Sequence, residues 1–275
     1  MKRLVVAAAA LLAAHGLALP ARAGEPAVAR QAWSFAGPFG QYDPAQLRRG
    51  LTVYREVCAT CHGLGQVAFR TLSQPGGPGL TTDEMRALAA GFEVPDGVDA
   101  EGMPRRRPGR PADFFPAPFP TPAAAAAANN GIAPPDLSLM AKARAVPAGL
   151  PRLLSDIVTQ YQEAGPDYIF GYLTGYADPP EGVEPPPGTF YNPHFISGPF
   201  TAMPPALFDD IADYGDGTPQ TADQYARDVS AFLMWAAEPT LDARKKLGFM
   251  AMVFLAVLAV LLLFVRKAIW SRAGQ

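Results

Sequence analysis

The sequence predicts a mainly α-helical fold with one C-terminal transmembrane helix. Apolar residues recur at helical spacing, two segments carry helix-capping boxes, and no stretch alternates clearly between apolar and polar residues. The segment 247–265 holds no charged residue, and as a helix it would extend about 28 Å, close to the ~30 Å hydrocarbon core of a bilayer. The chain has 275 residues with 30 prolines and 26 glycines, so long loops must join the helices.

The N-terminal end has the pattern of a secretory signal peptide. A basic start precedes an alanine-rich apolar run, and the small-residue site Ala21-Arg22-Ala23 follows. A first transmembrane helix is the alternative, but the run is short and ends at a cleavage-like site. We therefore expect a signal peptide over 1–23, an exported domain over 24–243, and an anchor with a short cytoplasmic tail over 244–275.

Charge is distributed unevenly along the chain. The formal net charge is −2, but the segment 24–243 holds all 25 acidic residues and 14 of the 23 basic ones, which makes it −11. Such a surface attracts basic partners over a long range, or it serves solubility alone. The acidic balance argues against a nucleic-acid partner.

Helix signals organise the exported segment. Asp43 and Pro44 begin a helix whose apolar stripe runs on through Cys58 and Cys61, and Gly63 can end it. Capping boxes open further helices at 81–84 and 221–224. Other helices are expected over 150–164, from 222 to about 238, and from about 240 into the apolar run.

A proline-rich stretch divides this segment. Residues 104–122 contain seven prolines and four arginines, and an alanine run follows over 123–128. Taken alone, this composition is typical of a linker between two domains. Phe114, Phe115 and Phe119 also lie there, and a linker would not need them.

The two cysteines of the chain lie in Cys58-Ala59-Thr60-Cys61-His62, the C-x-x-C-H pattern of c-type haem attachment. Two thiols one helical turn apart can add to two vinyl groups on one haem edge, and the adjacent histidine can reach the iron. A thioredoxin-like pair is one alternative, but it needs a preceding strand. A structural zinc site is another, but it needs more ligands than His194 can add.

Loop chemistry favours Met203 as the second iron ligand. Prolines on both sides stiffen the segment 198–205, so its thioether can be presented without helix strain. His194 is the alternative and would give a bis-histidine haem of lower potential. The other methionines are expected elsewhere: Met85, Met140 and Met234 in the core, Met250 and Met252 in the span, and Met103 in a loop.

Several segments together resemble one known family. They are RRGLTVYREVCATCHGLGQVAFRTL (48–72), ANNGIAPPDLSLMAKAR (128–144), GPDYIFGYLTGYADPPEGV (165–183), FYNPHF (190–195), and the stretch 202–248 that contains FLMWAAEP. C-x-x-C-H occurs in many cytochromes, whereas NNGIAPPDLS and FLMWAAEP are specific to the family. The sequence thus resembles cytochrome c1, the haem subunit of the ubiquinol–cytochrome c oxidoreductase (cytochrome bc1) complex.

The resemblance implies a type-I cytochrome c-like haem domain with long loop insertions, plus the C-terminal transmembrane helix. In such a domain the proline-rich stretch wraps the core and does not separate domains. The resemblance also implies one haem c per chain, held through two thioethers. The implied residues are Cys58 and Cys61 for attachment, His62 and Met203 as iron ligands, and Asn129, Pro134, Arg144 and Tyr168 around the haem.

The implied function is one-electron transfer within quinol–cytochrome c reductase, with no catalytic acid, base or nucleophile in this chain. The electron would come from the Rieske iron–sulfur protein beside cytochrome b and pass to a soluble or membrane-tethered cytochrome c. The complex would be dimeric and held in the lipid of a bacterial inner membrane, with the haem domain periplasmic and the C-terminus cytoplasmic. The alternatives are a free-standing membrane-anchored cytochrome shuttle and an exported thiol–disulfide or metal-delivery protein.

Overall fold

The structure is a computed structural model that describes residues 28–145 and 150–273; the expected signal peptide lies outside them. The described elements are α2 (Pro44–Glu56), the 3-10 turns η1 (Cys58–Thr60) and η2 (Phe69–Ser73), α3 (Thr82–Ala90), β1 (Glu93–Val98), β2 (Pro104–Pro108), α4 (Pro122–Ala128), α5 (Met140–Ala143), α6 (Leu150–Thr159), α7 (Ala164–Thr174), β3 (Phe190–Tyr191), β4 (Phe200–Thr201), α8 (Ala222–Ala237) and α9 (Leu241–Ala273).

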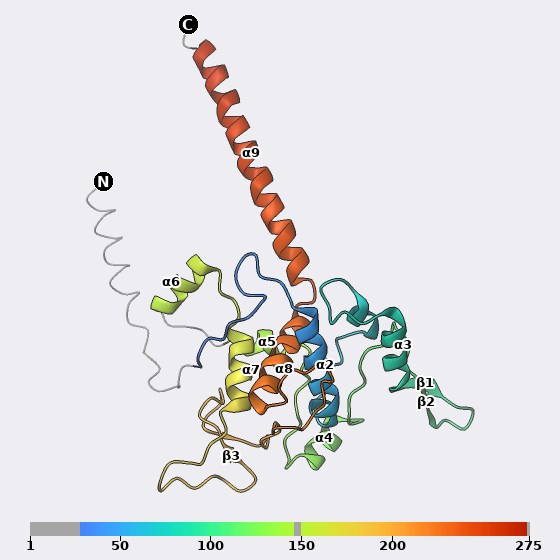
Figure 1. The fold of residues 1–275 in the computed structure, drawn as a ribbon. Helices are drawn as coiled ribbons and strands as arrows, with labels where there is room; N and C mark the ends of the chain where they lie inside the picture. Colours follow the sequence, from blue (N-terminus) through green and yellow to red (C-terminus); the bar gives the residue numbers. More distant parts are fainter. Residues whose placement is uncertain (1–27, 146–149, 274–275) are drawn as a thin grey trace, which may run out of the picture.

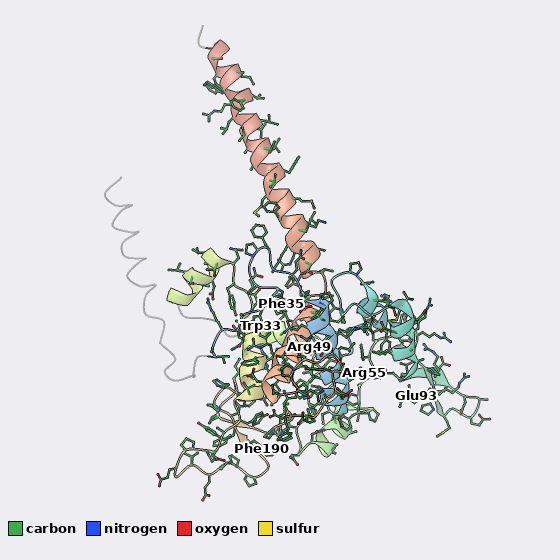
Figure 2. The ribbon with its side chains drawn as sticks, in the orientation of Figure 1. Trp33, Phe35, Arg49, Arg55, Glu93 and Phe190 are labelled. Carbon is green, nitrogen blue, oxygen red and sulfur yellow. The ribbon has the colours of Figure 1, made fainter. Side chains whose placement is uncertain are left out.

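The elements form a helical head from which α9 projects as a long rod (Figure 1). Within the head α8 packs against α2, α5 and α7, and these four helices enclose the core. Figure 2 shows Trp33 and Phe35 at the end of the head nearest α9, and Phe190 at the opposite end. The mainly helical fold class is confirmed.

Helix α2 begins as the sequence predicts and ends earlier. The Asp43 carboxylate accepts a hydrogen bond from Ala45 N at 2.9 Å, with proline at the first helical position. The helix ends at Glu56, where Val57 N–H closes the last turn, so the expected continuation to Gly63 is wrong. Both cysteines consequently lie beyond the helix and are half-buried. Cys58 still packs against the core, as the apolar stripe predicts.

The two capping boxes also behave as predicted at their N-terminal residues. At α3, Thr81 and Glu84 each accept a hydrogen bond from the other's backbone N–H, which completes the box. At α8, the Thr221 hydroxyl accepts from Gln224 N at 3.3 Å. These side chains satisfy N–H groups that the first helical turn leaves without a partner.

The proline-rich stretch packs onto the core, so it is not a linker. Phe115 is buried, its ring lies 4.5 Å from that of Phe69, and Phe69 N donates to Asp113 O at 2.9 Å. The start of the stretch forms β2, and β2 pairs with β1 in an antiparallel hairpin. The sequence analysis missed this hairpin because its residues are mostly exposed and do not alternate in polarity. The alanine run likewise forms α4.

The helix expected over 150–164 ends early, and a second helix that the sequence analysis did not predict begins at Ala164. Helix α6 ends at Thr159, Gln160 then takes a left-handed φ of 55°, and α7 begins at Ala164. A left-handed residue ends an α-helix, so the chain changes direction there. The second helix continues to Thr174, beyond the end that the sequence predicted.

Helix α9 fits a single membrane anchor. Among the described residues it is the one helix long and apolar enough to cross a bilayer, over 241–271. Its apolar side chains are exposed along the apolar run, for example Phe254 and Phe264 at 66% each. Exposure of so many large apolar residues indicates a lipid environment.

The crossing of α2 and α8 yields a stability prediction. A Cβ on Gly50 would lie 2.1 Å from Asp228 O and 2.6 Å from the Phe232 Cβ. Gly50→Ala must push the helices apart, and we expect a net loss of about 1–3 kcal/mol in the free energy of unfolding. Denaturant unfolding in detergent measures it. Gly248→Ala is the matched control, since nothing lies within 4 Å of its Cβ position, and an equal loss there would contradict the prediction.

Candidate functional site

The C-x-x-C-H motif forms a compact turn directly after α2. Cys61 N and His62 N both donate to Cys58 O, at 3.1 and 2.9 Å. The turn therefore places one thiol at its start and the other at its end. Both cysteine residues are half-buried, and Cys58 packs against the core.

The His62 ring is held in one tautomer. Its Nδ1 lies 2.8 Å from Pro135 O, and a carbonyl oxygen can only accept, so Nδ1 carries the proton. The Nε2 atom then keeps its lone pair for a metal. Burial lowers the pKa of His62, which favours the neutral, ligating form. The Tyr54 hydroxyl also donates to His62 O at 3.2 Å.

The segment that contains Pro135 is joined by hydrogen bonds to the residues just after the motif, beginning with Leu137 N, which donates to Gly63 O at 2.9 Å. Gly65 N donates to the Asp136 carboxylate at 2.7 Å, and Gln66 N donates to the Ser138 hydroxyl at 3.0 Å. A Cβ on Gly63 would lie 3.0 Å from the same carboxylate, so the close approach favours glycine. These contacts hold the Pro135 carbonyl beside His62.

Cys61 and Pro134 line one surface cavity of about 250 Å³. Its other wall is the proline-rich segment 117–122. The cavity thus brings one attachment cysteine and one predicted haem-contact residue together. It also shows that the proline-rich stretch contributes to the site as well as to the core.

The Met203 segment is held from α7. Met203 N donates to the Thr201 hydroxyl at 3.3 Å, and the Tyr176 hydroxyl donates to Met203 O at 2.9 Å. A further hydrogen bond of 2.7 Å joins the Tyr172 and Thr201 hydroxyls. Burial raises the pKa of Tyr176, so its hydroxyl stays protonated and able to donate. Hydrogen bonds therefore hold both the N–H and the carbonyl group of Met203.

His194 lies on the same side of the head. Its backbone N–H donates to the Asn192 side chain at 3.0 Å, and that side chain donates to Tyr172 O at 2.7 Å. The ring packs so closely on Gly175 that a Cβ there would lie 2.4 Å from its Cδ2. Within the described residues, the buried Nδ1 of His194 has no hydrogen-bond partner. His194 therefore stays the alternative to Met203.

The other predicted contact residues occupy separate places. The Asn129 side chain donates to Ala125 O at 2.8 Å, so it caps the end of α4. Arg144 ends α5 and is partly exposed. Tyr168 is buried in α7, and its hydroxyl accepts from Ile196 N at 3.3 Å. Helices α5 and α7 pack together, so Arg144 and Tyr168 lie on neighbouring helices.

The state of the thiols bears on the redox alternative. Burial and the neighbouring Cys61 raise the pKa of the Cys58 thiol to about 12. Thiol–disulfide enzymes use a cysteine whose pKa is lowered, because the thiolate is the nucleophile. The turn also follows a helix, not a strand. Both observations count against a thioredoxin-like pair.

A family model for the Cytochrome C1 family matches residues 33–273. The chain belongs to the cytochrome c1 family. It is 47% identical over 241 residues to "Cytochrome c1" of Blastochloris viridis, which covers 87% of this chain and 85% of that protein. It is 46% identical over 268 residues to "Cytochrome c1, heme protein, mitochondrial" of Saccharomyces cerevisiae. That match covers 97% of this chain and 77% of that protein.

A third relative is longer. The chain is 50% identical over 240 residues to "Cytochrome b/c1" of Bradyrhizobium diazoefficiens, over 87% of this chain but 35% of that protein. The chain thus spans about a third of the length of that relative. Membership of the cytochrome c1 family makes the chain an electron-transfer haem subunit and does not favour either alternative function.

The donor set of this cytochrome c1 family member fits a c-type haem. The two cysteines stand at the two ends of one turn. The Nδ1 proton of the adjacent His62 is directed to Pro135 O, which leaves the lone pair on Nε2. Histidine and methionine are a ligand pair used by c-type cytochromes. The sequence analysis missed Pro135 and Tyr176 because Pro135 acts through its carbonyl and Tyr176 through the backbone of Met203, and neither leaves a spacing signal.

Tyr176→Phe tests the support of the Met203 segment. The variant removes the donor to Met203 O, and we expect a loss of about 1 kcal/mol in the free energy of unfolding. Denaturant titration of the full chain measures it. The control is Tyr191→Phe, which keeps the ring contact with Phe200 at 5.9 Å and is expected to change little. Equal effects of the two variants would contradict a specific role for Tyr176.

Proposed function

We propose that this chain carries one electron at a time on a single haem c attached through Cys58 and Cys61. The hydrogen bond from His62 Nδ1 to Pro135 O is the observation that carries the proposal. It supports a neutral imidazole with Nε2 directed to a metal, next to two thiols on one turn. When bound, the haem supplies a centre that changes its oxidation state by one electron without forming a bond to substrate.

The proposed roles of the protein side chains follow from where they lie. His62 Nε2 and the Met203 thioether are the two iron ligands, the first positioned by Pro135 and the second by Tyr176. Asn129, Pro134, Arg144 and Tyr168 are the proposed neighbours of the haem, of which Pro134 already shares a cavity with Cys61. Such a ligand pair raises the reduction potential relative to bis-histidine ligation.

The chain is proposed to work inside quinol–cytochrome c reductase. One relative is named "Cytochrome b/c1" and another "Cytochrome b-c1 complex catalytic subunit, mitochondrial". These names support cytochrome b as a partner. The Rieske protein as electron donor and a cytochrome c as acceptor are proposed from the resemblance of the sequence to the cytochrome c1 family. We further propose a dimeric complex in a bacterial inner membrane, with a cleaved signal peptide, the head in the periplasm and the C-terminus in the cytoplasm.

The acidic residues near α3 are a candidate docking cluster for that cytochrome c, and ion pairs compensate part of its charge. The sequence suggested one there: Asp83, Glu84, Glu93, Asp96, Asp99 and Glu101. In the structure Glu84 pairs with Arg48 at 3.0 Å, and Asp96 pairs with both Arg105 and Arg107. Asp83 also pairs with Arg86 at 3.3 Å, so three of the six carboxylates have a basic partner. We therefore propose that electrostatic attraction rests mainly on the net charge of the whole head.

Replacement of the two candidate ligands separates their roles. We expect Met203→Leu to lower the haem potential while the haem stays covalently bound, because the thioether stabilises the reduced iron. His194→Leu is the matched control and should leave the potential close to that of the parent. Redox titration and haem staining after denaturation measure the two properties. A change of potential in His194→Leu, with none in Met203→Leu, would make His194 the ligand.

The charge of the head predicts salt dependence. Between about 0.01 and 0.15 M salt the Debye length falls from about 30 to about 8 Å. We expect electron transfer from the membrane-bound complex to a basic cytochrome c to slow by about tenfold over that range. Stopped-flow kinetics measures the rate, and a small uncharged oxidant is the control whose rate should not change. A flat rate for the basic cytochrome would contradict steering by charge.

A further inference from the structure

Helix α6 carries an exposed apolar face. Leu153, Leu154, Ile157 and Val158 are exposed by 46, 62, 58 and 83%. They form two neighbouring pairs, four residues or about one turn apart, so all four lie on one side of the helix. Asp156 lies off this face and is only partly exposed. The helix is thus amphipathic, with its apolar side turned away from the head.

Contacts on the polar side fix this orientation. Asp156 forms an ion pair with Arg30, whose guanidinium lies 4.4 Å from the centre of the Tyr161 ring. The Tyr161 hydroxyl in turn donates to the Asp167 carboxylate of α7 at 2.6 Å. The polar side of α6 is therefore tied to the head through the segment near residue 30. A rotation that buried the apolar face would break the ion pair.

The region around α6 is continuous with the start of the membrane span. Phe39 is 72% exposed, and its ring lies 5.5 Å from that of Phe249 in α9. A cavity of about 270 Å³ is lined by Phe39, by Gln160 at the end of α6, and by Phe249 and Met252 of α9. Figure 1 shows α6 beside the foot of α9, on the side of the head from which α9 projects.

We propose that α6 lies in the surface of the same bilayer that α9 spans. Its four apolar residues enter the boundary between headgroups and acyl chains, and Phe39 makes a second contact at the foot of α9. An amphipathic helix with its polar side held by protein and its apolar side free is suited to that boundary. A lipid surface is favoured over a protein partner because Gln160, directly after α6, lines one cavity with Phe249 and Met252 of the spanning helix, and the Phe39 ring packs edge-on against Phe249 beside it.

This second contact has a mechanical consequence. A head held by α9 alone could tilt and turn about the helix where it enters the membrane. A second contact away from that axis restricts both motions. The head would then present its C-x-x-C-H side at a defined angle to the membrane, which suits exchange of electrons with other proteins of that membrane.

Accessibility of a nitroxide label tests the proposal. Val158→Cys in the full chain, in lipid vesicles, is labelled and its collision rates with oxygen and with a water-soluble nickel chelate are measured. Val98→Cys is the matched control, an exposed valine (64%) on the β1–β2 hairpin away from α9 (Figure 1). The unsubstituted chain, labelled in parallel, gives the background from Cys58 and Cys61.

We expect the oxygen-to-nickel ratio to be several-fold higher at residue 158 than at residue 98. In the Val158→Cys chain, Ile157→Glu should lower the ratio several-fold, whereas Thr159→Glu, off the apolar face, should not. Equal ratios at 158 and 98 would place the helix in water and overturn the proposal. Low collision rates with both reagents at 158 would show a protein covering the face, and would also overturn it.

Discussion

The close crossing of α2 and α8 is the constraint on which the rest of the head depends. Because Gly50 has no Cβ, its backbone packs directly against the backbone of Asp228 and the Cβ of Phe232. The buried Asp228 carboxylate also accepts from Arg49 Nε at 2.9 Å across the crossing. Figure 2 shows Arg49 between these helices. Because the haem motif follows α2 after one residue, any shift of this helix would carry Cys58 and His62 with it.

The two candidate iron ligands are positioned by different means. His62 is oriented by a carbonyl oxygen on a segment whose side chains accept hydrogen bonds from the backbone N–H groups just after the motif. Met203 is placed through its own main chain, by hydroxyls anchored on or just beyond α7. Both arrangements are made by protein contacts alone. Such support holds ligand atoms within the narrow range that a metal site needs.

The acidic residues after α3 and the arginines of β2 show that the local charge of a surface depends on which segments the fold pairs. The acidic run near α3 and the arginines of the proline-rich stretch are separate in sequence, but β1 and β2 pair them in one hairpin. Ion pairs of this exposed kind add little to stability. They do cancel local charge, so a surface that seemed strongly acidic from its sequence is close to neutral there.

The sequence by itself determined the local features: the Asp43 and Thr81 caps, the apolar span, the haem motif and the family, because each depends on residues close in the chain or on a pattern of segments. The features that depend on contacts between residues far apart in the chain were decided only by the tertiary structure. It ended α2 before the motif, turned the chain at Gln160, packed Phe115 into the core and brought the Pro135 carbonyl to His62. The physical reason is that a backbone carbonyl or a packing surface has no sequence signature until folding brings the partners together.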